Sequence, residues 1–184
     1  MKDRSPIALR GREWYLRARP GLGVAARVDP DRRFSKIPLF ADRIVIWNQH
    51  NSSAGDRGTV NCVVTVLDQG RVKRRIPLTL PWSDDSPAWA VIRMPRGPVD
   101  QVRVDVVTYR GRGGGLSEIE VFDGRTNISQ HCSAVADHYW EDDARFHPRS
   151  VTDGNTTGDD GIWLLDNQKT GWVTVSLAEF IDQP

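Results

Sequence analysis

The sequence has few cysteines, almost no net charge and no long apolar run. Its two cysteines, Cys62 and Cys132, are too few for a disulfide framework and lack the spacing of metal ligands. We expect two buried thiols, with one mutual disulfide as the alternative. The 25 basic and 24 acidic side chains leave a net charge of +1, so no overall attraction to nucleic acid or to an anionic membrane is expected.

Segments that would cross or target a membrane are also missing from the sequence. No apolar run approaches the roughly 18 residues of a membrane-spanning helix, so no membrane span is predicted. Residues 1–19 carry charges throughout and have no apolar core, which is unlike a secretory signal peptide. The sequence therefore leaves the compartment unknown, and the protein is expected to be cytoplasmic or part of a larger exported protein.

The sequence lacks apolar residues at helical spacing. It has short runs in which apolar and polar residues alternate. Sixteen glycines and eleven prolines interrupt the chain every few residues. About seven strands are predicted, at 41–47, 59–68, 74–80, 88–94, 100–109, 115–122 and 171–177, with weaker candidates at 13–18 and 22–29. Because a sheet with one apolar face must bury that face against another sheet, the pattern predicts an all-β protein with an antiparallel β-sandwich.

Charge is distributed unevenly along the chain. Residues 1–34 have a local balance of +5, and residues 136–166 have a balance of −6. These regions could attract each other or a partner, although two solvated surfaces of opposite sign are the favoured interpretation. We expect a basic N-terminal segment at 1–34, which could add a strand pair, and a β-sandwich domain at 35–184.

Three segments carry a resemblance to a known family. Residues 127–177 contain an alanine-rich strand, an Asp-Gly-Asn turn at 153–155 and the strand Gly-Trp-Val-Thr-Val-Ser-Leu at 171–177. Residues 41–68 contain a strand that ends in Trp-Asn-Gln, a loop with Arg57 and a further strand, and residues 114–122 contain Ser-Glu-Ile-Glu. Together they resemble the galactose-binding-like jelly-roll sandwich of discoidin domains, coagulation-factor type C domains and family 32 carbohydrate-binding modules.

The three segments stand in an unusual order. In the family, the Asp-Gly-Asn segment comes first and the Ser-Glu-Ile-Glu strand comes last. Here residues 35–122 resemble the middle and end of the family fold, and residues 125–184 resemble its beginning. A circular permutation explains this order, because neighbouring first and last strands can be rejoined by a short connection. A fragment of two tandem modules is the alternative.

The Asp153–Gly158 turn is rich in oxygen ligands, as Ca²⁺ requires. The resemblance implies a structural calcium ion where this turn meets the closing strand. Its implied ligands are the side chains of Asp153, Asn155 and Glu118 and the carbonyl groups near Ser117, Ser150 and Gly158. The alternative is a plain Asx turn, with Glu118 as a surface acid.

Sugar recognition needs an aromatic plate and planar hydrogen-bonding groups. The loop from His138 to Arg149 contains both. The resemblance implies a binding face on loops at one end of the sandwich, formed by His138, Tyr139, Trp140, Asp142, Arg145 and His147 together with Asn48, Gln49, His50, Arg57, Tyr109 and Arg112. It also implies that Trp163 and Trp172 belong to the core. Ordinary roles in solvated loops are the alternative for the polar residues.

Catalytic motifs are missing, so no enzyme is predicted. The glycine-rich run 109–115 precedes a strand and not a helix, which favours a flexible loop over a phosphate or nucleic-acid site. The sequence therefore predicts a non-catalytic, lectin-like module that binds a glycan. A protein-interaction or self-assembly domain of the same fold is the main alternative, and a small hydrolytic enzyme is a distant one.

Overall fold

The structure is a computed structural model that describes residues 38–50, 55–157 and 161–180, all within the compact unit Lys36–Pro184. Its strands are β1 (Phe40–Asn48), β2 (Arg57–Asp68), β3 (Arg71–Thr79), β4 (Trp89–Pro98), β5 (Gln101–Gly111), β6 (Gly115–Asp123), β7 (Thr126–Asn127), β8 (Cys132–Ala136), β9 (Trp163–Leu164) and β10 (Trp172–Phe180). The weaker strand candidates at 13–18 and 22–29, and the whole segment 1–34, lie outside the described residues.

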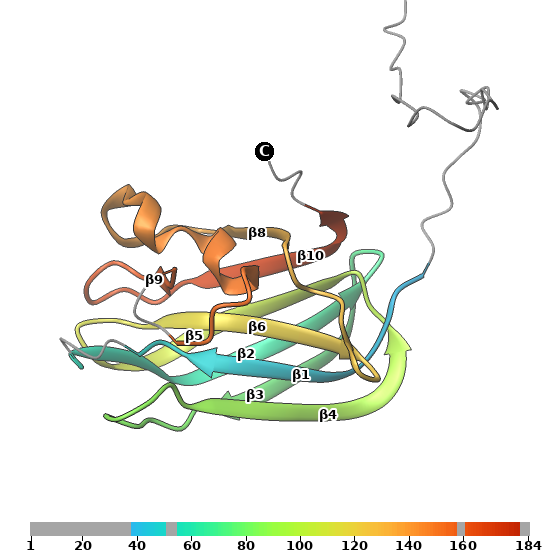
Figure 1. Ribbon diagram of the computed structural model, residues 1–184, viewed down its shortest axis with the longest axis horizontal. Helices are drawn as coiled ribbons and strands as arrows, with labels where there is room; N and C mark the ends of the chain where they lie inside the picture. Colours follow the sequence, from blue (N-terminus) through green and yellow to red (C-terminus); the bar gives the residue numbers. More distant parts are fainter. Residues whose placement is uncertain (1–37, 51–54, 158–160, 181–184) are drawn as a thin grey trace, which may run out of the picture. The chain divides into compact units, whose positions relative to one another are not determined.

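The strands form two antiparallel sheets (Figure 1). One sheet has the order β4-β1-β6-β7, with β9 also paired to β6, and the other has the order β3-β2-β5-β10-β8. This arrangement confirms the predicted all-β sandwich. The jelly-roll connectivity stays a prediction.

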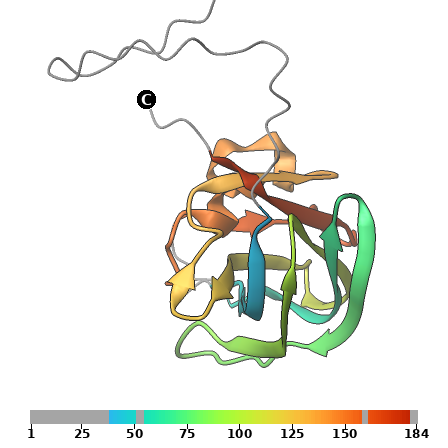
Figure 2. The ribbon, with the colours of Figure 1, turned by 90° about the vertical axis from the view of Figure 1, so that its right-hand side faces the viewer.

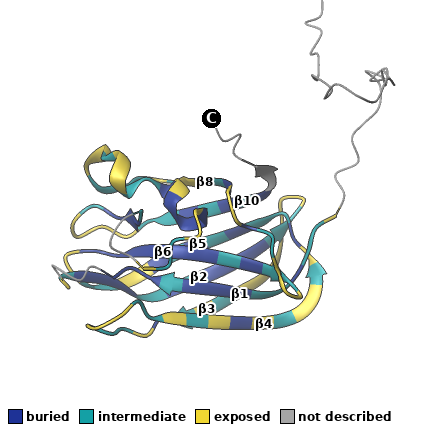
Figure 3. Cartoon of the chain, in the orientation of Figure 1, coloured by how far each residue is buried: buried dark blue, intermediate teal, exposed yellow. Residues whose placement is uncertain are grey.

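Valine alternation builds the inner face of the β3-β2-β5-β10-β8 sheet. Val64, Val104 and Val173 are directly paired across β2, β5 and β10, and all three are fully buried. The next row, with Val63, Asp105 and Trp172, faces outward because successive side chains of a strand point to opposite faces. Each buried valine contributes about 1.5–3 kcal/mol through its apolar surface. Figure 3 shows buried residues along the strands at the centre of the sheets.

The two predicted core tryptophans have different environments. Trp163 on β9 is fully buried, and its indole N–H donates to the carbonyl oxygen of His138 at 3.1 Å. The prediction for Trp172 is wrong. Trp172 precedes the inward-facing Val173 and so lies on the outer face, where the Arg103 guanidinium sits 4.3 Å from its ring centroid.

The parts of the chain before and after residue 124 share both sheets. β6 ends at Asp123 and pairs with β7 in an antiparallel hairpin, with Phe122 opposite Asn127. Further along the chain, β9 pairs with β6 and β10 pairs with β5. The described residues therefore form one sandwich, as a circularly permuted chain would. The permutation itself stays a prediction.

Between β8 and β9 the chain forms three short 3-10 turns, η1 (Trp140–Asp142), η2 (Ala144–Phe146) and η3 (Pro148–Thr152). They lie beside β8 in both views (Figures 1 and 2). The Thr152 hydroxyl donates to the Cys132 carbonyl at 2.7 Å, which fixes η3 against β8. In the described part of the chain, no helix has the length and apolar character needed to cross a membrane.

The glycine-rich run 109–115, predicted to be a flexible loop, comprises the end of β5, the connection 112–114 and the first residue of β6. Gly113, Gly114 and Gly115 are buried. A Cβ atom on Gly115 would lie 2.5 Å from the carbonyl oxygen of Trp163, and Gly111 adopts a φ of +62°. The glycines are needed because the backbone passes very close to β9 and to Asp56.

Both cysteines are free, buried thiols. Burial, with a smaller contribution from the charge of Asp105, raises the pKa of Cys62 to about 12, and burial also raises the pKa of Cys132. Because the thiolate is the reactive form, we expect neither thiol to react with a soluble disulfide reagent in the native protein. Both should react in guanidinium chloride. Rapid labelling of either thiol in the native protein would contradict this arrangement.

Candidate functional site

Several loops meet at one end of the sandwich, which we call the loop end (residues 48–50, 55–58, 110–114, 137–147 and 165–171). Backbone hydrogen bonds join them: Arg112 N–H donates to Asp56 O at 2.9 Å, and Gln168 N–H donates to Arg112 O at 2.7 Å. The Glu141 N–H donates to the Asp166 carboxylate at 3.1 Å. The predicted binding residues at 48–50, 57, 109–112 and 138–147 therefore lie at the same end of the sandwich.

Arg57 is central to the loop end and is only 4% exposed. Its guanidinium donates to the Leu165 carbonyl at 3.4 Å and to the Asn167 side chain at 3.0 Å. The same guanidinium lies 4.8 Å from the centroid of the Trp140 ring, within cation–π range. Arg57 thus links the start of β2 to the β9–β10 loop and to Trp140, the aromatic residue that is predicted to contact a sugar ring.

Asn48, at the end of β1, and the next two residues, Gln49 and His50, are predicted binding residues, and all three are buried. The Asn48 amide donates to the carbonyls of Thr59 and Pro81 at 2.9 and 3.0 Å and accepts from Thr59 N–H at 3.0 Å. His50 Nε2 lies 3.3 Å from the Asp84 carbonyl, and the amide of Gln49 has no partner among the described residues. Asn48 therefore joins the end of β1 to Thr59 of β2 and to Pro81, and His50 contacts the same β3–β4 loop at Asp84.

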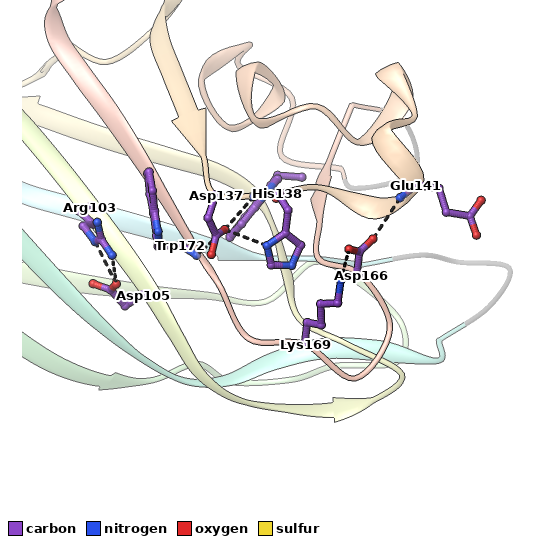
Figure 4. Close-up of polar contacts among 9 residues, drawn as sticks. Arg103, Asp105, Asp137, His138, Glu141, Asp166, Lys169 and Trp172 are labelled. Atoms are coloured by element: carbon purple, nitrogen blue, oxygen red, sulfur yellow. Dashed lines mark hydrogen bonds and ion pairs between the residues drawn. The ribbon is translucent and has the colours of Figure 1, made fainter.

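Two aspartates hold the 137–147 segment in place (Figure 4). Asp137 accepts from the backbone N–H groups of His138 and Trp172 at 2.9 and 3.1 Å and lies 3.2 Å from His138 Nδ1. Asp166 accepts from Glu141 N–H and from the Lys169 ammonium at 2.9 Å, and its bond to Lys169 lowers its pKa. Neither aspartate is predicted as a site residue from the sequence.

The 137–147 segment carries five more of the predicted sugar ligands, Tyr139, Trp140, Asp142, Arg145 and His147. Trp140 is half-buried and packs against Phe146, with ring centroids 5.0 Å apart. Tyr139 contacts His147, whose pKa is lowered by burial and by the charge of Arg149. Asp142 is exposed, and Arg145 is exposed and pairs with Asp143 at 2.6 Å.

Two further predicted ligands lie at the end of β5. Tyr109 is half-buried and pairs with Thr59 across the sheet, and Arg112 is 68% exposed and lies 3.4 Å from the Asp56 carboxylate. The Asp56 carboxylate therefore lies between two arginines, because Arg57 Nε is also 3.5 Å from it. The loop end thus carries Trp140 beside a group of charged and amide side chains.

Glu118 on β6 is fully buried, so the interpretation of Glu118 as a surface acid is wrong. One carboxylate oxygen accepts from Gly154 N–H at 3.3 Å, and the other has no partner among the described residues. Burial, followed by the negative charge of Asp153, raises the pKa of Glu118 to about 9. Burial also raises the pKa of Asp153.

The turn at 153–157 lies beside Glu118, since its Gly154 N–H donates to the Glu118 carboxylate. Asp153 accepts from Asn155 N–H at 2.8 Å, and a Cβ atom on Gly161 would lie 2.7 Å from the Asp153 carboxylate. Ser150 is buried in η3, the buried Ser117 donates to the Asn48 carbonyl at 3.1 Å, and Gly158 lies outside the described residues.

The unpaired oxygen of Glu118 fits a cation. A positive charge would offset both the cost of burying an ionised carboxylate and its repulsion from Asp153. The described residues contain no group of three His, Cys, Asp or Glu side chains that could hold a metal. A cation here would therefore need neutral oxygens beside the two carboxylates, which is compatible with Ca²⁺.

Comparisons with protein families, with curated proteins and with solved structures give no match.

Proposed function

We propose that this chain is a non-catalytic carbohydrate-binding module that takes a glycan at the loop end. The observation that carries the proposal is the position of Trp140, a half-buried indole held at the loop end by Arg57. An indole held in this way offers an apolar surface to the C–H face of a pyranose. The amide and charged groups of Asn167, Gln168 and Arg112 lie on the adjoining loops and are exposed, so they can bond sugar hydroxyls.

The loop end would bind weakly. Trp140 offers one aromatic surface, and the polar groups around it are exposed to water, which competes for their hydrogen bonds. We therefore expect dissociation constants of roughly micromolar to millimolar. Several copies of the module, or several sugars on one chain, would be needed for tight attachment.

We also propose that Ca²⁺ binds between β6 and the turn at 153–157. The carboxylates of Glu118 and Asp153 and the amide oxygen of Asn155 would hold the ion, and the resemblance adds the carbonyls of Ser117, Ser150 and Gly158. The support is the buried, unpaired oxygen of Glu118 next to a second carboxylate. The ion would join the turn to the sheet and so stabilise the fold.

A glycan array tests the sugar-binding proposal. We expect the wild-type chain to bind at least one glycan class and Trp140→Ala to lose at least about tenfold in affinity, the usual scale for a central aromatic contact. The matched control is Phe122→Ala, because Phe122 is also a half-buried aromatic residue beside a guanidinium, that of Arg43 at 4.0 Å, but lies at the end of β6 away from Gly115 and the loop end. Absence of binding by the wild type, or an equal loss in Phe122→Ala, would contradict the proposal.

A protein-interaction or self-assembly domain is the second candidate function. It is favoured by an exposed apolar area on β4, where Trp89 contacts Trp47 with ring centroids 4.9 Å apart and Val91 is 44% exposed. Light scattering over a series of protein and salt concentrations tests it. A monomer at all concentrations would count against self-assembly, and a dimer that persists in Trp89→Ala would exclude this area as its interface.

A further inference from the structure

The edge strands β3 and β4 border a cavity of about 250 Å³. Its lining comprises Ala41, Val66, Lys73, Arg74, Met94, Pro95, Arg96, Gly97 and Pro98. Ala41 lies near the start of β1, whereas Asn48 ends the same strand at the loop end. Seven residues of strand correspond to about 23 Å, so the cavity and the loop end are separate sites.

The cavity combines an apolar floor with a cationic rim. Ala41 and Val66 are buried, and Met94 packs against the core. Arg74 is paired with Val66 across β2 and β3, so both side chains point to the inner face of the sheet. A guanidinium therefore stands at an inward-facing position of an edge strand, where Ile76 and Leu78 further along β3 pack against the core.

Positive charge is concentrated on this flank. Arg71, Lys73, Arg74 and Arg75 give four cations in five consecutive exposed residues of β3, and Arg96 adds a fifth from β4. Lys73 pairs with Asp68 at 3.1 Å, and Arg96 pairs with Asp123 at 2.6 Å. Within the part of the chain that the structure describes, Arg71, Arg74 and Arg75 have no ion-pair partner.

We propose that this cationic cleft (Lys73, Arg74, Arg96 and the adjoining Arg71) binds a linear polysaccharide that carries sulfate or carboxylate groups. From Arg71 to Arg74 the strand extends over about 10 Å, which suits an extended chain with regularly spaced anions. Guanidinium groups bind such oxyanions with two parallel hydrogen bonds. The cavity beside Arg74 would take one anionic group, and its apolar floor would contact the sugar ring.

Two other roles explain the cationic cleft less well than polysaccharide binding does: protection of the sheet edge and binding of nucleic acid. Charged side chains protect an edge strand from pairing with another chain, but this protection does not require the cations to line a cavity with an apolar floor. Single-stranded nucleic acid is bound by aromatic stacking together with positive charge, and none of the residues that line the cavity is aromatic. The chemistry of the cleft therefore favours a saccharide polyanion. This inference uses residues outside the loop end and does not depend on the glycan proposed there.

Affinity chromatography and calorimetry with the full chain test the cleft. The probes are heparin, which is sulfated, polygalacturonate, which carries only carboxylates, and single-stranded DNA. We expect at least one polysaccharide to bind more tightly than the DNA, and Lys73→Gln/Arg74→Gln to lower that affinity by about tenfold or more for each cation removed. Binding should weaken as salt rises.

The control variant is Arg125→Gln/Arg149→Gln, which removes the same charge from two exposed residues outside the cleft. We expect it to bind like the wild type, and Arg74→Lys to recover part of the loss. Thermal melts check that each variant folds. An equal loss in the control variant, tighter binding of DNA than of both polysaccharides, or no binding to either polysaccharide would overturn the proposal. Loss of glycan binding in Trp140→Ala, with polysaccharide binding unchanged, would not count against the proposed polysaccharide site.

Discussion

In calcium-free buffer at pH 8, Glu118→Gln is expected to raise the midpoint of thermal unfolding. The wild-type carboxyl is fully buried beside Asp153, and its pKa is about 9 in place of 4.5. At pH 8 the unfolded chain releases this proton to water, whereas the folded chain must keep it or bury a charge. A neutral amide of the same shape removes that cost and still accepts from Gly154 N–H.

The pH dependence of the wild type follows from the same shift. Between pH 4.5 and about 9 the folded state binds a proton at Glu118 that the unfolded state has lost. The contribution of Glu118 to stability is therefore largest below pH 4.5 and falls as pH rises, by up to about 1.4 kcal/mol per pH unit. We expect Glu118→Gln to remove this slope. Urea unfolding at pH 5, 6.5 and 8 in EDTA measures it.

Calcium should reverse this trend in proteins that keep Glu118. Because the ion requires an ionised Glu118, it must displace the proton, and its stabilising effect should be larger at pH 8 than at pH 5. At a hundredfold excess over the dissociation constant the gain is about 2.7 kcal/mol. Glu118→Gln should lose most of the gain, and the exposed Glu141→Gln should keep it. An unchanged Tm with calcium at pH 8 would remove Glu118 and Asp153 from the proposed site.

The strands could be predicted from the sequence because their signal is local. The alternation at 59–68 predicts most of β2 (Arg57–Asp68), and that at 100–109 predicts most of β5 (Gln101–Gly111). β7 and β9 have two residues each, too few for a periodic pattern. They exist because β6 offers backbone partners on its free edge, which is a tertiary effect.

The candidate site was only partly predictable. The resemblance brought Trp140 and Arg57 to one end, and the structure places the guanidinium 4.8 Å from the indole centroid. The resemblance could not show that Arg57 is buried, because the β9–β10 loop that covers Arg57 lies more than a hundred residues further along the chain. Asp137 and Asp166 were missed for the same reason. Their long-range partners are the backbone N–H groups of Glu141 and Trp172, and no side-chain motif reveals such a contact.

Arg57 joins the loops, and its removal should affect stability and glycan binding together. Arg57→Ala removes the hydrogen bonds to Leu165 and Asn167 and the contact with Trp140. Because the side chain is buried and charged, we expect a loss of about 3 kcal/mol in the free energy of unfolding. Chemical denaturation measures this loss. Arg112→Ala is the control for stability alone, because this exposed arginine should change it by less than about 0.5 kcal/mol.

A second arginine variant separates the support of Trp140 from general destabilisation. Arg57→Lys keeps the charge but lacks the planar group that reaches both loops and lies near the indole. We expect it to remain folded at 20 °C while Trp140 moves more freely, seen as a change in tryptophan fluorescence that is absent in Arg57→Lys/Trp140→Phe. Glycan affinity should then fall in Arg57→Lys although the sheets are intact. Full affinity in a folded Arg57→Lys variant would mean that the loop end does not need this arginine to present Trp140.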